Sequence, residues 1–203
     1  MNFKQYLCEK NGIGIFFIDI DETLLETKAK IYVIYNNKII KKLSNKQFNN
    51  YQLNQGESFD FREFRDSELF SKTSKPIIPM IKKIRAIFKN ASAAGSEVYL
   101  LTARGDFDNK EKILEYFRGL GVKVGKSSEG KIHIIRAGNL GKPSGIAKKE
   151  IIEGFVKTGK YQRIRLYDDD TKNLDKFLEL QDEYPYDFQA YLVSKTSSKR
   201  YHL

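Results

Sequence analysis

Residues 14–23 read GIFFIDIDET, a short apolar run that ends in two aspartates and a glutamate. Aromatic and β-branched side chains in a run of this length predict a buried strand, and we place that strand at Gly14–Ile20. The run is far too short to cross a bilayer. Asp19 and Asp21 come at its end, where two like charges repel each other unless a cation compensates them.

Downstream of Pro76, strand-length apolar runs alternate with segments of helical periodicity. The expected strands are Glu97–Ala103, Lys131–Arg136, Arg163–Tyr167 and Phe188–Val193. The expected helices are Ile77–Ala94, Lys110–Leu120, Ile146–Val156 and Leu174–Leu180. With the first strand, this alternation predicts an α/β fold in which a five-stranded, mainly parallel sheet lies between helices.

Residues 25–74 do not follow the alternation and are too long for a plain connection. Two strand-like runs, Ala29–Tyr35 and Lys38–Leu43, flank Asn36-Asn37, a dipeptide that tolerates positive φ, so a β-hairpin is expected. Phenylalanines among charged residues follow, and we expect this part to be short and partly irregular. The predicted organisation is a core of residues 1–24 and 75–203 with a small insert, residues 25–74.

Composition limits the class of protein. The chain has 203 residues, a formal net charge of +10 and one cysteine, Cys8, so an intramolecular disulfide framework is excluded. No bilayer-length apolar run or signal-peptide pattern is present, and we expect a cytoplasmic protein without a membrane partner. The excess of lysine and arginine suits a nucleic-acid partner, and it suits a solvated surface equally well.

Polar residues follow three of the expected strands. Asp19 and Asp21 follow the first strand, Thr102 is near the end of the second, and Asp168–Asp170 follow the fourth. Ligands of open α/β sheets bind beyond the carboxyl ends of the strands, and clustered carboxylates there suit Mg²⁺ with oxygen ligands. The alternative for each cluster is a turn or a helix N-cap.

These residues resemble the motifs of the haloacid dehalogenase (HAD) superfamily of phosphotransferases. Residues 17–24 (FIDIDETL) are similar to its first motif, hhhDxDxT. Thr102 matches the Ser/Thr of the second motif, and Asp168-Asp169 matches the acidic fourth motif, with Asn173 four positions later. The resemblance extends over about Gly14–Val193 and implies a Rossmann-like core with a small cap inserted after the first strand.

The resemblance also implies a mechanism. Asp19 would attack phosphorus and form an aspartyl-phosphate, while Asp21 would protonate the leaving oxygen and then deprotonate the hydrolytic water. The Asp19 side chain, the Asp21 carbonyl and Asp169 would hold Mg²⁺, and Asp168 and Asn173 would support them.

The phosphate-binding candidates are Thr102, Ala103, Arg104 and Lys148. Arg104 is suited to clamp a phosphate, although an exposed arginine in a turn is the plain alternative. Lys148 lies mid-way on the apolar face of its expected helix, so a bound phosphate would explain it; a snorkelling lysine is the alternative. Lys149, at the margin of that face, is the reserve candidate, and Lys142 precedes the helix.

Within the superfamily, the chain looks most like the 3′-phosphatase domains of bacteriophage polynucleotide kinase/phosphatases. It contains no GxxxxGK[ST] phosphate loop, so a kinase half is excluded. We therefore expect a Mg²⁺-dependent phosphomonoester hydrolase, with nucleotides or 3′-phosphate ends of nucleic acid as candidate substrates. The alternative is a catalytically idle HAD scaffold that binds nucleic acid or an assembly partner. The sequence leaves the oligomeric state open.

Overall fold

The computed structural model describes residues 12–48, 50–126 and 129–203. Cys8 and the start of the expected core segment 1–24 lie outside the described residues. The described chain forms a six-stranded sheet with strand order β11-β10-β9-β1-β7-β8. In chain order these strands are β1 (Gly14–Ile18), β7 (Glu97–Thr102), β8 (His133–Arg136), β9 (Arg163–Asp168), β10 (Asp187–Val193) and β11 (Ser198–Tyr201).

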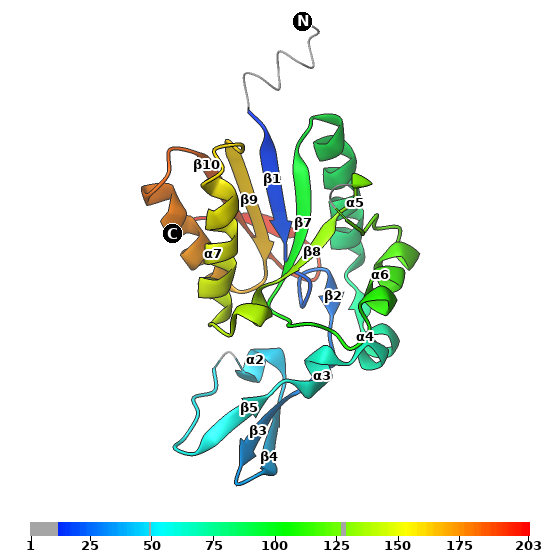
Figure 1. Ribbon diagram of the computed structural model, residues 1–203, viewed down its shortest axis with the longest axis vertical. Helices are drawn as coiled ribbons and strands as arrows, with labels where there is room; N and C mark the ends of the chain where they lie inside the picture. Colours follow the sequence, from blue (N-terminus) through cyan, green and yellow to red (C-terminus); the bar gives the residue numbers. More distant parts are fainter. Residues whose placement is uncertain (1–11, 49, 127–128) are drawn as a thin grey trace, which may run out of the picture.

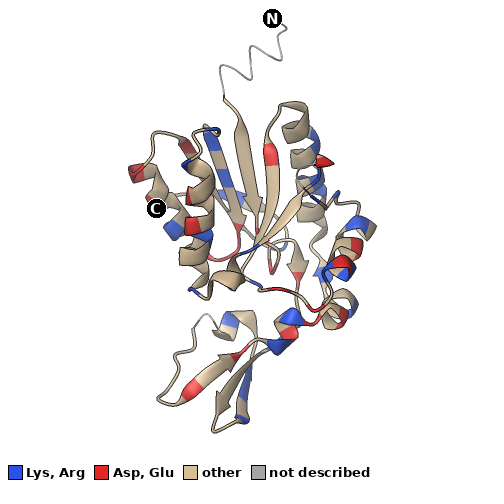
Figure 2. Ribbon diagram, in the orientation of Figure 1, with Lys and Arg blue, Asp and Glu red and all other residues tan. Residues whose placement is uncertain are grey.

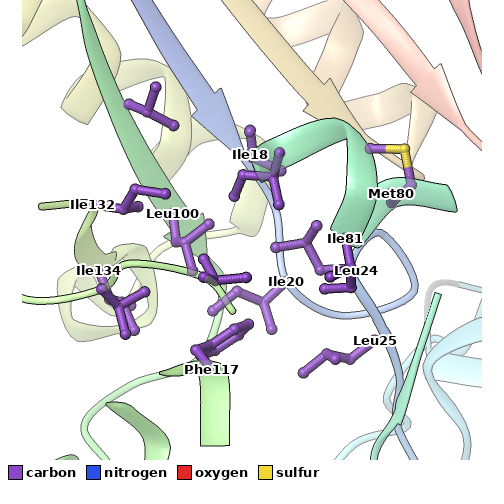
Figure 3. Close-up of a cluster of buried hydrophobic side chains, with 14 of the residues drawn as sticks. Ile18, Ile20, Leu24, Leu25, Met80, Ile81, Leu100, Phe117, Ile132 and Ile134 are labelled. Atoms are coloured by element: carbon purple, nitrogen blue, oxygen red, sulfur yellow. The ribbon is translucent and has the colours of Figure 1, made fainter. Parts of the chain in front are cut away.

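Helices cover both faces of this sheet, as the alternation predicts (Figure 1). Side chains of β1 alternate between two cores: Phe16 and Ile18 pack on one side, and Ile15 and Phe17 on the other. The first core, drawn in Figure 3, includes residues of α5 (Ile78–Ala93) and α6 (Lys110–Gly119). The second includes residues of α7 (Ser144–Val156) and α8 (Thr171–Leu178). The prediction of an α/β fold with a mainly parallel sheet is confirmed.

The expected number of strands, five, is wrong. β11 is a sixth strand, antiparallel to β10 at the edge of the sheet. Its sequence, SKRY, contains no apolar run, because an edge strand that is partly solvent-exposed needs none. The first strand also ends at Ile18 rather than Ile20, since the chain turns after Asp19 and returns through a positive φ of 57° at Glu22.

The insert forms its own three-stranded sheet with order β4-β3-β5. β3 (Ile31–Tyr35) and β4 (Lys38–Leu43) make the expected hairpin, with φ of 47° at Asn36 and 59° at Asn37. β5 (Glu57–Asp60) replaces the irregular stretch that we expected, and this expectation is wrong because Phe59 pairs with Val33 and packs on the small core of the insert. The sequence of β5, ESFD, holds a single apolar residue, so nothing in it marks a strand.

A two-stranded link of β2 (Leu25–Glu26) and β6 (Lys75–Pro76) connects the insert to the core. Three short helices complete this region: α2 (Asn45–Phe48), α3 (Arg62–Arg65) and α4 (Ser67–Thr73). The insert sheet lies beyond the carboxyl ends of the core strands (Figure 1). Lysine and arginine residues mark its strand β4 and its helix α3 (Figure 2).

In the described part of the chain, every helix is too short or too polar to span a membrane.

Candidate active site

The carboxyl ends of β1 and β9 bring two of the sequence motifs together. These strands are parallel neighbours, and the amide of Asp19 donates to the carbonyl of Tyr167 over 2.9 Å. Asp168 ends β9 and Asp169 follows it. One carboxylate oxygen from each of Asp19, Asp168 and Asp169 lies within 4.8 Å of the others. The central juxtaposition expected from the sequence is therefore present in the structure.

Lys148 lies between two of these acids. Its Nζ is 2.7 Å from Oδ1 of Asp19 and 2.6 Å from Oδ2 of Asp168, and the residue is 1% exposed. Burial alone would lower the pKa of this ammonium group, but the carboxylates of Asp168 and Asp19 outweigh it and raise the pKa. Lys148 is therefore a permanent positive charge inside the acidic cluster.

The neighbouring candidate lysines lie elsewhere. Lys149 pairs with Glu179 and Glu183, on the outer side of α7. Lys142 lines the cavity described below but pairs with Glu150. One residue along a helix turns a side chain by about 100°, which is why the adjacent lysines of α7 have different partners.

Two acids of the cluster, Asp19 and Asp169, have raised pKa values. Burial, more than the effect of any neighbour, raises the pKa of Asp19 well above its ordinary value. Burial and then the charge of Asp168 raise the pKa of Asp169 to about 7. Three carboxylates and one lysine leave two negative charges uncompensated when all are ionised. A single divalent cation would balance them.

The donor set fits a hard divalent cation. Carboxylate oxygens are the ligands that Mg²⁺ prefers, and Asp19, Asp168 and Asp169 supply them at one point. The sequence assigned Asp168 to a supporting role, whereas the structure includes it in this group. The side chain of Asp21 lies outside the group.

Asp168 and Asp169 are held in place by neighbouring polar groups. Asn173 Nδ2 donates to Asp168 Oδ1 over 2.9 Å, and the amide of Asp170 donates to the same oxygen over 3.0 Å. The hydroxyl of Thr23 donates to Asp169 over 3.4 Å. Asp170 itself is the N-cap of α8, accepting from the amide of Lys172. The helix-cap alternative thus describes Asp170, while Asp168 and Asp169 face the cluster.

Asp21 is paired with Arg104. Arg104 Nε lies 2.8 Å from Asp21 Oδ2 and Nη2 lies 2.6 Å from Asp21 Oδ1, a bidentate arrangement. The remaining hydrogen bonds of the guanidinium reach the insert: Nη1 donates to the carbonyl of Phe64 and Nη2 to the hydroxyl of Thr27. Arg104 is 2% exposed. It lies against Asp21 and the insert and also lines the cavity described below, so the alternative of an exposed arginine in a turn is wrong.

Two other phosphate-binding candidates, Thr102 and Ala103, lie at the end of β7 and just after it. Thr102 is fully buried, and its hydroxyl accepts from the amide of Arg104 over 3.1 Å. Ala103 lines the cavity. The backbone at Ala103 packs closely against Gly138, where an added Cβ would come within 2.2 Å of the Ala103 carbonyl oxygen.

A cavity of about 430 Å³ opens above the acids, between the core loops and the insert. Its floor includes Asp19, Asp21, Lys148 and Asp169. The insert contributes an apolar wall that sequence reasoning did not assign to the site: Ile31, Phe48, Phe61 and Phe64. The phenylalanines at positions 59, 61 and 64 were the feature of the sequence that could have indicated this wall.

Comparisons with protein-family models, with curated proteins and with solved structures found no match. The functional conclusion therefore depends on the geometry and chemistry of this site.

Proposed function

We propose that this protein is a Mg²⁺-dependent phosphomonoester hydrolase of the HAD type, acting through an aspartyl-phosphate. The observation that carries the proposal is the buried group of Asp19, Lys148, Asp168 and Asp169 at the carboxyl ends of β1 and β9, below a cavity of substrate size. A HAD-type core with the insert as its cap is part of the same proposal.

The chain's own residues can carry out the reaction in two steps. In the first, a carboxylate oxygen of Asp19 bonds to phosphorus as the ester oxygen leaves. Asp21, once protonated and with one oxygen turned away from Arg104, gives its proton to the leaving ester oxygen. In the second, Asp21 takes a proton from water, whose oxygen bonds to phosphorus and releases Asp19 and inorganic phosphate. A bound Mg²⁺ would offset the repulsion between the nucleophile and the phosphoryl oxygens.

Lys148 contributes to both steps. Its hydrogen bond to Asp19 fixes the orientation of the nucleophile, and its charge favours the approach of an anionic phosphoryl group. Asp168, held by Asn173 and Lys148, keeps that ammonium group in place.

Nucleotides and 3′-phosphate ends of nucleic acid are the candidate substrates. The exposed lysines of β4 and the +10 charge of the chain support them, because a basic surface attracts phosphate polymers. Rates on a 3′-phosphate oligonucleotide, a 5′-phosphate oligonucleotide, mononucleotides and sugar phosphates would rank them. Clear preference for sugar phosphates would contradict the nucleic-acid assignment.

The experiment that tests the activity is hydrolysis of a generic phosphate ester with Mg²⁺ or with EDTA. We expect Mg²⁺-dependent turnover that Asp19→Asn lowers by at least about 10³-fold, since the nucleophile is lost. Asp170→Asn is the matched control: asparagine also caps helices, so its turnover should stay within about threefold. Negligible turnover in wild type and Asp19→Asn alike would leave the alternative, a non-catalytic binding protein.

A further inference from the structure

The cavity above Asp19 has two unlike walls. The insert side carries large apolar side chains, Ile31, Phe48, Phe61 and Phe64. The core side combines small residues, among them Ala103, Gly105 and Gly138, with polar side chains such as Lys142 and Ser144. An aromatic wall on the insert side favours a flat group that lies against it.

Phe61 is the most exposed ring on this wall. It is 39% exposed, yet neighbouring rings fix it: centroids of Phe48, Phe59 and Phe64 lie 5.5, 6.0 and 6.3 Å away. The rings of Phe48 and Phe64 are each inclined to that of Phe61 by 85°. A ring held in this way offers a stacking surface that loses little conformational entropy when a ligand binds.

Polar partners for a leaving group are few on the insert side. Of the described insert residues that line this cavity, only Asn45 and Arg65 have polar side chains. A polyhydroxylated leaving group would exchange its hydrogen bonds to water for contact with phenylalanine, which is unfavourable for each unpaired hydroxyl. The apolar face of a planar ring has no such penalty.

We propose that this site selects phosphate monoesters whose leaving group carries a planar, weakly polar ring, which stacks on Phe61 while the phosphoryl group lies at Asp19. The inference rests on the proposed phosphatase function. The ring can belong to a nucleobase or to a simple aryl group, since both present an apolar face.

The test compares four esters of primary alcohols, so that leaving-group chemistry is matched: 2-phenylethyl phosphate, adenosine 5′-monophosphate, glycerol 3-phosphate and glucose 6-phosphate. We expect kcat/KM of the wild type to be at least about tenfold higher for the two ring-bearing esters. The better of these two identifies the ring as a nucleobase or an aryl group. Equal rates on glycerol 3-phosphate and 2-phenylethyl phosphate would overturn the proposal.

Phe61→Ala should abolish this preference, mainly by raising KM for the ring-bearing esters about tenfold, with glycerol 3-phosphate changed less than about twofold. The unchanged ester also reports that the variant is folded. Tyr35→Ala is the matched control, because Tyr35 is an equally exposed ring of the insert, at 44%, and is not among the described cavity-lining residues. A uniform loss on all four esters in Phe61→Ala would contradict a stacking role.

Binding separates this inference from the proposed function. In calorimetric titration, Asp19→Asn should bind 2-phenylethyl phosphate about tenfold more tightly than glycerol 3-phosphate. If the wild type hydrolyses none of the esters but this preference is present, the hydrolase proposal fails and the ring-binding site stands. If hydrolysis occurs without any ring preference in rate or binding, only the inference fails.

Discussion

At the level of single residues, the positive charge of Lys148 offsets the repulsion between the carboxylates of Asp19 and Asp168. It is the only described lysine that contacts both Asp19 and Asp168, and all three side chains are almost fully buried. Such a buried charge group is costly to break, because removal of one member leaves buried charge without a partner.

Lys148→Met should therefore destabilise the metal-free protein by about 3–5 kcal/mol. Thermal unfolding in EDTA measures the loss, and added Mg²⁺ should restore part of it by replacing the missing positive charge. Lys149→Met, one residue along the same helix, removes exposed ion pairs and should change stability by less than about 1 kcal/mol. Equal effects of the two substitutions would show that Lys148 has no special electrostatic role.

In the structure Arg104 is paired with Asp21 at the edge of the cavity, and we expect its main role to be positioning Asp21. Arg104→Lys keeps the charge but loses the bidentate geometry and the bonds to Phe64 and Thr27. We expect kcat to fall by about 10- to 100-fold with KM changed less than about threefold, because Asp21 is misplaced while the substrate still binds. A large rise in KM with kcat unchanged would instead assign Arg104 to phosphate binding.

The acids and the buried lysine of the site could be predicted from the sequence, for two physical reasons. Asp19 and Asp168 come at the ends of strands, which places both at the carboxyl edge of the sheet. Helical periodicity places Lys148 in the middle of the apolar face of its helix and Lys149 at its margin. The partner of Arg104 was not predictable, because an arginine side chain is long and its acceptors, Asp21 and the carbonyl of Phe64, come from distant segments.

At the level of elements, the insert owes its shape to a tight hairpin. Asn36 and Asn37 both have positive φ, a conformation that glycine adopts freely and β-branched residues avoid. The sequence predicted this turn from its two asparagines. It did not predict β5 or β11, since their sequences, ESFD and SKRY, each hold a single aromatic residue and no apolar run.

Asn37→Gly should leave the insert as stable or stabilise it slightly, whereas Asn37→Val should destabilise it by about 1–2 kcal/mol. Hydrogen exchange of the amides of β3 and β4 measures the change locally. Amides of β1, in the core sheet, are the internal control and should not change. Faster exchange in β1 as well would mean that the insert and the core unfold together.

At the level of the whole molecule, stability should depend on pH through the acidic cluster. Burial, with Asp168, raises the pKa of Asp169 from 3.8 to about 7. Between these values the folded protein holds a proton that the unfolded chain has released, so without metal the free energy of unfolding falls as pH rises from about 4 to 7. A divalent cation replaces that proton.

Added Mg²⁺ should therefore raise the unfolding temperature more at pH 8 than at pH 5, because the cation competes with the proton only at the lower pH. Differential scanning calorimetry with Mg²⁺ or EDTA at both pH values measures the difference. Asp169→Asn should remove most of it. If Mg²⁺ raised the unfolding temperature equally at both pH values, we would conclude that the cation does not bind at this cluster.

The most direct test of the central claim is the covalent state of Asp19 during turnover. The protein is quenched in acid while it hydrolyses a phosphate ester in the presence of Mg²⁺. It is then digested, and the masses of its peptides are measured by mass spectrometry. We expect one phosphoryl group on the peptide that contains Asp19 and none on that peptide of the Asp19→Asn variant. A wild-type protein that hydrolyses the ester but carries no phosphoryl group on that peptide would contradict the account.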